Sequence, residues 1–133
     1  MSRVKDKTLV QDGRRSLEWT CDKMPILAKI WERFKKEKPL AGIAVGVAIH
    51  VEQKTGILLK TLQSAGAEVS AASCNPLTTD DAVAVALAEE MDVFAWSGQR
   101  RMRSTTNASG RFFSCRFRGI LWRARFGGSV TVA

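Results

Sequence analysis

The chain has 133 residues, of which 45% are hydrophobic and 26% are charged, as is ordinary for one globular domain with one core. Its longest apolar stretch, residues 40–49, is shorter than the ~20 residues of a membrane helix, and no apolar segment follows the charged N-terminus as in a signal peptide. The cysteines Cys21, Cys74 and Cys115 are odd in number and far apart, which disfavours a disulfide framework and a zinc site. We therefore expect a cytoplasmic protein with no membrane partner.

The net charge of +8 is concentrated at the end of the chain. Residues 1–99 contain thirteen basic and thirteen acidic residues, whereas residues 100–133 contain eight arginines, no lysine and no acidic residue. We divide the chain accordingly into a body, residues 1–99, and an Arg-rich tail, residues 100–133. We expect the tail to be disordered or non-native, as after a change of reading frame, although residues 113–117 alternate like a short strand.

The first predicted element is a helical segment over residues 14–36, divided where Pro25 can begin a second helix. Its expected apolar face consists of residues three or four apart. These are Leu17, Cys21, Met24, Ile26, Ile30 and Phe34, with Leu27 and Trp31 beside them. Residues 35–39, rich in lysine and ending in proline, terminate the segment.

A repeating unit follows, in which strands and helices alternate. We expect strands over residues 42–49, 67–73 and 92–96 and helices over residues 52–65 and 80–90. The strands end 24 and 23 residues apart, a spacing typical of successive units with parallel strands. The predicted fold class is therefore α/β: a partial doubly wound, Rossmann-like parallel sheet with a βαβαβ unit, preceded by an N-terminal helical segment.

Each helix of this unit has an expected buried stripe. The stripes are Leu58, Leu62 and Ala65 in the first helix and Val83, Ala86 and Leu87 in the second. Gly66 occupies the place of a C-cap after the first helix, and Thr79 is the expected N-cap of the second.

Polar, chemically capable side chains follow the first two strands. Residues 50–55 read His-Val-Glu-Gln-Lys-Thr, and residues 73–81 read Ser-Cys-Asn-Pro-Leu-Thr-Thr-Asp-Asp. The carboxyl ends of neighbouring parallel strands commonly form a ligand crevice. His50, the only histidine, can carry a proton or donate a hydrogen bond there, although a surface loop would also explain it. Glu52 and Lys54 equally suit a solvated helix start.

The residues alone predict an α/β ligand-binding domain and nothing more specific. The dinucleotide fingerprint, the phosphate-binding P-loop, the serine nucleophile motif and metal-ligand spacings are all absent. Asn75 with Pro76 also suits an ordinary turn, and Thr78 with Asp80 also suits a helix cap.

At these motifs the chain resembles the adenosylhomocysteinase (S-adenosyl-L-homocysteine hydrolase) family, from about Val4 to Gly98. The resemblance is carried by Met24-Pro25, the strand into His50, Leu62-x-x-x-Gly66-Ala67-Glu68-Val69, Ser73-Cys74-Asn75, Thr78-Thr79-x-Asp81 and Val93-Phe94-Ala95-Trp96. It implies that the body is the N-terminal part of the family's nucleoside-binding, or substrate-binding, domain.

The resemblance also implies an activity, which is the NAD-dependent reversible hydrolysis of S-adenosyl-L-homocysteine to the nucleoside and L-homocysteine in the methylation cycle. The family oxidises the ribose 3′-hydroxyl, removes the 4′ proton, eliminates homocysteine, adds water and reduces the ketone again. Its catalytic Asp, Lys and second His and its NAD-binding glycines fall outside the matching residues. We therefore expect this chain to bind no NAD and to be inactive alone, although family members form homo-oligomers.

The site residues follow from the same resemblance. His50 is the implied catalytic residue, near the ribose 5′ side and the thioether. The implied substrate-binding residues are His50, Glu52, Lys54, Thr55, Cys74, Asn75, Thr78 and Asp80. The family usually has Ser in place of Thr78 and Gln in place of Asp80.

One departure from the family's sequence pattern concerns the residues implied to face the purine base of the substrate. The common family motif is His-x-Thr-x-Glu-Thr, whose Glu faces the adenine amino group, and the corresponding residues here are Glu52 and Lys54. A carboxylate accepts a hydrogen bond from an amine, whereas an ammonium only donates, so Lys54 suits the keto group of hypoxanthine. This variant resembles archaeal and thermophilic members. We predict a parent enzyme that uses S-inosyl-L-homocysteine at least as well as S-adenosyl-L-homocysteine.

The alternative is a small non-enzymatic α/β protein that binds a nucleoside in the body and RNA along the basic tail. Phenylalanines and Trp122 among arginines are typical of single-stranded nucleic-acid binding. We favour the enzyme family, with nucleic acid not an expected partner. An ordered tail that continues the sheet would support the alternative.

Overall fold

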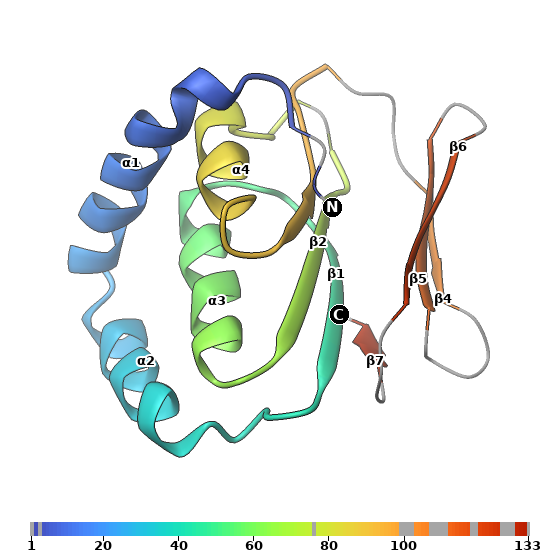
Figure 1. Ribbon diagram of the computed structural model, residues 1–133. Coiled ribbons are helices and arrows are strands. Elements are labelled where there is room, and N and C mark those ends of the chain that lie inside the picture. Colours follow the sequence, from blue (N-terminus) through green and yellow to red (C-terminus); the bar gives the residue numbers. More distant parts are fainter. Residues whose placement is uncertain are drawn as a thin grey trace.

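The computed structural model describes residues 2, 4–75 and 77–98, together with the backbone of four further strands between residues 103 and 132. After a 3₁₀ turn at Lys7–Leu9, the elements of the body follow in chain order. They are α1 Val10–Asp22, α2 Pro25–Glu37, β1 Ala44–Ile49, α3 Gln53–Ser64, β2 Glu68–Ser73, α4 Asp81–Leu87 and β3 Asp92–Phe94. All four helices lie on one side of the sheet (Figure 1). The α/β class and the βαβαβ unit are confirmed.

The three strands of the body form a parallel sheet with β2 in the middle. Ala44 to Ile49 of β1 are level with Glu68 to Ser73 of β2, and Ser70 of β2 is level with Asp92 of β3. The other edge of β1 pairs in parallel with β7, Val130–Val132. Since this sheet contains neighbouring strands of one direction joined by helices, its carboxyl edge carries the loops of the candidate site.

The remaining strands of the tail form a separate antiparallel sheet. They are β4 Arg103–Thr106, β5 Phe112–Phe117 and β6 Ile120–Arg125, in the order β4-β5-β6. The short strand predicted at residues 113–117 lies within β5. We predicted that the tail is disordered or non-native. This prediction depends on side chains and segments outside the described residues, so it stays a prediction.

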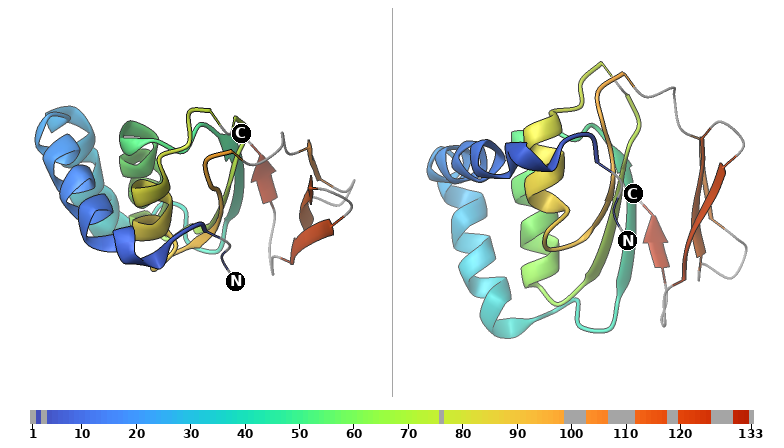
Figure 2. Two further views of the ribbon diagram at one scale, coloured as in Figure 1. Left: turned by 90° about the horizontal axis from the view of Figure 1, so that it is seen from above. Right: turned by 45° about the horizontal axis from the view of Figure 1, so that its top comes forward.

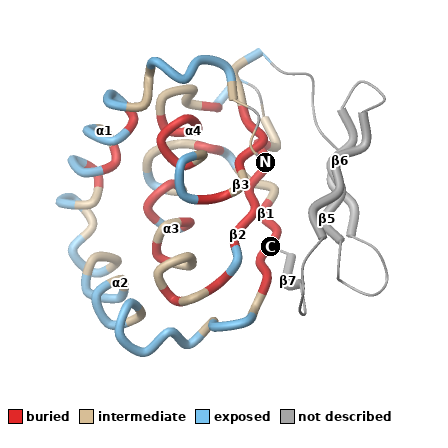
Figure 3. Tube along the Cα trace, in the orientation of Figure 1, coloured by how far each residue is buried: buried red, intermediate tan, exposed pale blue. Residues whose placement is uncertain are grey.

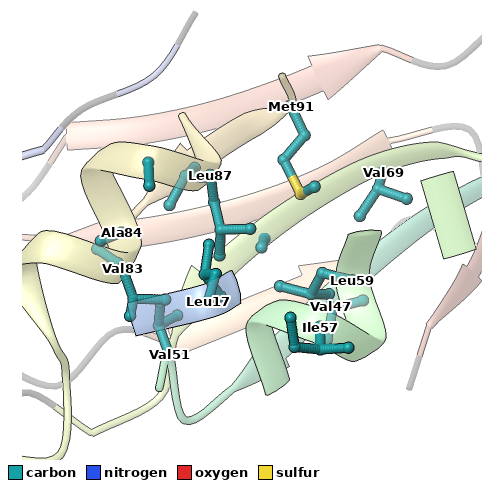
Figure 4. Close-up of a cluster of buried hydrophobic side chains, with 14 of the residues drawn as sticks. Leu17, Val47, Val51, Ile57, Leu59, Val69, Val83, Ala84, Leu87 and Met91 are labelled. Carbon is teal, nitrogen blue, oxygen red and sulfur yellow. The ribbon is translucent and has the colours of Figure 1, made fainter. Parts of the chain in front are cut away.

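The helices form two layers over the sheet (Figure 2). Helices α3 and α4 lie directly on it, and α1 contacts both of them from outside. The strands of the body are largely buried (Figure 3). Val47 and Val69 join the core beneath the helices (Figure 4), and Val93 belongs to the same core. Because α4 lies between the sheet and α1, its residues 83–87 are all buried. The predicted stripe of Val83, Ala86 and Leu87 is therefore confirmed, within a helix that is buried on more than one side.

Helix α1 begins at Val10, earlier than predicted, and runs through Gly13. A glycine inside a helix is normally unfavourable. Here a Cβ on Gly13 would lie 2.0 Å from the carbonyl oxygen of Ala82 and 2.9 Å from the Cβ of Ala86. The glycine therefore permits α1 to approach the backbone of α4 closely, and helix periodicity alone does not reveal such a contact.

The predicted apolar face of α2 is wrong in part. Ile26 is 76% exposed and Ile30 is 37% exposed, whereas Leu27, Trp31 and Phe34 are half-buried. The reason is that α2 is an outer helix and contacts α1 and α3 along one side (Figure 2). The apolar residues of α2 extend around the helix farther than this contact does.

The predicted stripe of α3 is also wrong at one position. Leu58 is 40% exposed, while Ile57, Leu59 and Thr61 are buried. Helix α3 contacts β2 on one side and α1, α2 and α4 on others, so it buries a wider surface than a single stripe. The predicted C-cap is confirmed, because Gly66 follows α3 with a φ of +93°.

The first residues of the chain lie along the free edge of β3. The Ser2 hydroxyl donates to the carbonyl of Met91 and accepts from the N–H of Val93, both at 3.1 Å. Farther on, Lys5 Nζ donates to Ser97 Oγ at 2.7 Å and lies 3.2 Å from Asp81 Oδ2. These contacts cover part of an edge strand that would otherwise present unpaired backbone groups.

Asp81 is the charged centre of this contact. Ser97 donates to it twice, from its N–H to Oδ1 and from its hydroxyl to Oδ2, each at 2.6 Å. Burial disfavours the carboxylate, but the hydrogen bonds from Ser97 and the Lys5 ammonium outweigh it and hold the pKa of Asp81 below its ordinary value of 3.8.

This lowered pKa gives the contact of Asp81 a pH dependence. A carboxyl with a depressed folded-state pKa contributes stability above its unfolded pKa, and the contribution is lost as the pH falls through the folded value. We expect the difference in unfolding free energy between wild type and Asp81→Asn to be full above about pH 4 and to shrink below it. Urea unfolding at stepwise lower pH measures this difference. Asp22→Asn, at an exposed carboxyl, is the control, and a difference for Asp81→Asn that stays constant with pH would contradict the account.

Candidate functional site

Two loops meet at the carboxyl edge of the sheet. The first loop, residues 50–52, joins β1 to α3, and the second loop, residues 74–80, joins β2 to α4. Ile49 and Ser73, the last residues of the two strands, are level with each other, so both loops start at the same height. Backbone hydrogen bonds then join the loops, from Cys74 N to Ile49 O at 3.2 Å and from Asp80 N to Val51 O at 2.8 Å.

His50 is exposed at the start of the first loop, and its ring contacts the second loop. Its Nδ1 lies 2.6 Å from the hydroxyl oxygen of Thr78. Its backbone is held by Thr55, whose hydroxyl donates to the His50 carbonyl at 2.6 Å and accepts from the N–H of Glu52 at 3.0 Å. Three predicted site residues, His50, Thr55 and Thr78, therefore lie in one hydrogen-bonded group.

Asp80 joins the loops through its side chain. Oδ1 accepts from the N–H groups of Ala82 and Val83, at 3.0 and 3.1 Å, so Asp80 is the N-cap of α4. Oδ2 accepts from Nε2 of Gln53 at 2.6 Å. Both carboxylate oxygens thus have protein partners, and a direct contact between Asp80 and a ligand stays a prediction.

The structure corrects one capping prediction and adds one residue to the site. Thr79 is not the N-cap of α4; it is buried, and its hydroxyl lies 2.5 Å from Ser73 Oγ and 3.0 Å from the carbonyl of Asn75.

Sequence reasoning missed Gln53, because a polar residue in the first turn of a helix is ordinarily solvated. Only the proximity of the second loop shows that its amide has a partner there.

The second loop is shaped by Asn75. Its side-chain Oδ1 accepts from the N–H of Leu77 at 3.0 Å, which is the turn expected of an Asn followed by Pro. Cys74 and Asn75 are half-buried, and Thr78 is exposed. The loop therefore presents the Thr78 hydroxyl to His50 and carries a thiol and an amide that are half-buried.

Glu52 and Lys54 lie at the N-terminal end of α3, and they differ in exposure. Glu52 is the N-cap of α3 and is half-buried, whereas Lys54 is exposed. Among the ion pairs between described residues, none involves Lys54. Its ammonium is therefore held by no carboxylate in this part of the chain and can turn toward a ligand.

The strand–helix turns of the body do not fit NAD. A dinucleotide needs glycines in the turn after a strand, so that the backbone can approach the pyrophosphate. Residues 50–52 and 74–80 contain no glycine. Gly42 precedes β1, and Gly56 lies within α3, where a Cβ would be 2.6 Å from Leu17 Cδ2. Neither of these two loops therefore provides a dinucleotide cradle, and Gly56 serves helix packing.

The described part of the chain offers neither a metal site nor a membrane-spanning helix. It contains no group of three His, Cys, Asp or Glu residues that could hold a metal ion. Among its helices, none is long and apolar enough to cross a membrane. A hollow of about 710 Å³ lies at the opposite, amino end of β2 and β3, near Glu68 and Asp92. Two of its carboxylates, Glu89 and Glu90, pair with Arg14 and Lys60. Because the hollow lies at the amino ends of the strands, it is separate from the edge that carries the candidate site.

Fold and loops together define an α/β domain whose candidate site lies at the carboxyl edge of a parallel sheet. The family model for S-adenosyl-L-homocysteine hydrolase matches residues 1–110, and the chain belongs to this family. The match extends past Gly98, the last residue of the motifs that resemble this family.

Curated relatives from archaea are similar over most of the chain. The S-inosyl-L-homocysteine hydrolases of Methanopyrus kandleri and Methanocaldococcus jannaschii are 50% identical over 97 residues and 47% identical over 100 residues. These matches cover 72% and 74% of this chain and 23% and 24% of the relatives. The adenosylhomocysteinase of Pyrobaculum aerophilum is 47% identical over 110 residues, 82% of this chain and 25% of that protein. The chain thus spans about a quarter of the length of these relatives.

The capping role of Asp80 predicts a measurable effect on stability. Asp80→Ala removes the N-cap of α4 and the partner of Gln53, so we expect the free energy of unfolding to fall by about 1–2 kcal/mol. Asp12→Ala, at an exposed carboxylate in the first turn of α1 that caps no helix, should cost less than about 0.5 kcal/mol. Urea unfolding of both variants makes the comparison. Equal losses would contradict the capping role.

Proposed function

We propose that the two loops form one wall of a nucleoside site, which in a complete family member serves the reversible hydrolysis of a nucleosyl-homocysteine to the nucleoside and L-homocysteine. The observation that carries the proposal is the contact of His50 with Thr78 across two neighbouring strand ends. It brings together residues that the family resemblance assigned separately to the substrate. The family match supports the same reading.

Within this site we assign the proton transfer at the ribose 5′ side to His50. When the carbon–sulfur bond breaks, the electron pair stays on sulfur. The imidazolium form of His50 supplies the proton and is left as neutral imidazole. Histidine is the side chain best suited to exchange protons near neutral pH. Thr55, Cys74, Asn75 and Thr78 are proposed to position the nucleoside around it.

We propose hypoxanthine as the preferred base. Lys54 is exposed and has no carboxylate partner among the described residues, so its ammonium can donate to the 6-keto oxygen of hypoxanthine. The 6-amino group of adenine offers no acceptor at that place. Two of the similar archaeal proteins are named S-inosyl-L-homocysteine hydrolases, which supports this choice.

We further propose that this chain binds no NAD and does not turn over substrate by itself. NAD supplies the hydride chemistry of the family when bound, and neither loop of the candidate site contains a glycine for its pyrophosphate. Self-association and a cytoplasmic location, which the resemblance implies, stay predictions.

A second candidate is a non-enzymatic nucleoside- or RNA-binding protein. One observation favours it, which is that β7 of the tail extends the sheet by pairing with β1. An RNA affinity that falls steeply with salt would support this candidate, because phosphate contacts release counterions.

The base preference is tested by calorimetric titration of the full chain with S-inosyl- and S-adenosyl-L-homocysteine. We expect the inosyl compound to bind about tenfold more tightly, which corresponds to about 1.4 kcal/mol and is within the range of one charge-assisted hydrogen bond. Lys54→Glu should reverse the order. Lys29→Glu, with the same charge change at an exposed position of α2, should leave it unchanged.

Two results would count against the proposal. A wild-type preference for the adenosyl compound, or an unchanged ratio in Lys54→Glu, would refute the assignment of Lys54. Failure of the wild type to bind either compound would refute the nucleoside site in this chain.

A further inference from the structure

The contact between His50 and Thr78 leaves open which atom donates. The Thr78 hydroxyl oxygen lies 2.6 Å from Nδ1 of His50, and either group can supply the proton. In a neutral imidazole one ring nitrogen carries hydrogen and the other accepts. The direction of this single hydrogen bond therefore determines what His50 offers to a ligand.

The surroundings of Thr78 decide the direction. Its hydroxyl has one hydrogen and two acceptors within reach, Nδ1 of His50 at 2.6 Å and the carbonyl of Asn75 at 3.3 Å. The Asn75 carbonyl has nearer donors, the hydroxyls of Thr79 at 3.0 Å and of Ser73 at 3.1 Å. Because these two hydroxyls lie 2.5 Å apart, one can donate to the other and the second to Asn75. The hydrogen of Thr78 is thus best used on Nδ1.

We propose that Thr78 is a positioning residue, whose hydroxyl donates to Nδ1 of His50 and thereby places the ring proton on Nε2. The ring is fixed from one side by Thr78, and the His50 backbone is fixed by Thr55, which donates to its carbonyl at 2.6 Å. Two threonines from different segments therefore fix His50, Thr78 at the ring and Thr55 at the backbone carbonyl. Nε2 remains for the ligand.

The consequence concerns the neutral form of the ring, which then presents Nε2–H as a hydrogen-bond donor. Such a donor selects an acceptor on the ligand, such as a thioether sulfur or a sugar oxygen, over an amine or ammonium. This role toward a ligand rests on the proposed nucleoside site. The direction of the hydrogen bond does not, since it is a property of the free chain.

Because His50 is the only histidine, its ring nitrogens can be read without assignment ambiguity. We suggest long-range ¹H–¹⁵N correlation spectra of the ¹⁵N-labelled full chain at a pH where the ring is neutral. The expected result is that Nε2 has the chemical shift of a ring nitrogen that carries hydrogen. Nδ1 should have the shift of a nitrogen without hydrogen, displaced by the hydrogen bond that it accepts. A proton found mainly on Nδ1 overturns the proposal, and this wild-type measurement needs no variant to fold.

Three variants test whether Thr78 is responsible. Thr78→Val keeps the β-branched shape and removes the hydroxyl, so the Nδ1 shift should move to that of a nitrogen without a hydrogen bond and the second tautomer should appear. Thr78→Ser should restore the wild-type spectrum. Leu77→Ala, at the 90% exposed neighbour, should leave it unchanged. A Thr78→Val spectrum identical to wild type overturns the role of Thr78.

Addition of S-inosyl-L-homocysteine separates this inference from the proposed function. A shift of the Nε2 signal supports both. An unchanged Nε2 signal, with the proton on Nε2 and the Thr78→Val effect present, supports the positioning role while it refutes the nucleoside site.

Discussion

The parallel pairing of β1 with β2 determines where the candidate site lies. Val45 is level with Val69 and Val47 with Ala71, and these residues face the helices together. A slip of one residue would turn every core side chain of one strand to the other face of the sheet, so the buried valines fix the register. The same register brings Ile49 level with Ser73, and the two loops begin side by side as a result.

Core packing and site chemistry are therefore linked through a few hydrogen bonds. Asp80 caps α4, which is buried between the sheet and α1, and the same carboxylate accepts from Gln53 at the start of α3. The second loop is consequently attached to rigid elements at its end and to β1 at its start, through Cys74 N and Ile49 O. These attachments place His50 and Thr78 within hydrogen-bond distance of each other.

The spacing of the apolar residues and of the strand ends, together with the proline at a helix start, was enough to predict three features. These are the parallel strands, the division at Pro25 and the buried residues of α4. Such sequence patterns were not enough where tertiary contact decides. The predicted helical segment began after Gly13, yet α1 runs through this glycine, which permits close contact with Ala82. Ile26 and Leu58 were predicted to be buried but lie on the outer sides of α2 and α3. For the site, residue types and strand ends indicated His50 and Thr78, whereas the Gln53–Asp80 contact depends on three-dimensional proximity alone.

The central claim is that both loops together form one ligand-binding wall. It is tested most directly by mapping backbone amide shifts of the full ¹⁵N-labelled chain during titration with S-inosyl-L-homocysteine. The account predicts that the changes are concentrated in residues 50–55 and 74–80, at the carboxyl edge of the sheet. Changes concentrated instead around the hollow near Glu68 and Asp92, or no changes in either loop, would contradict it.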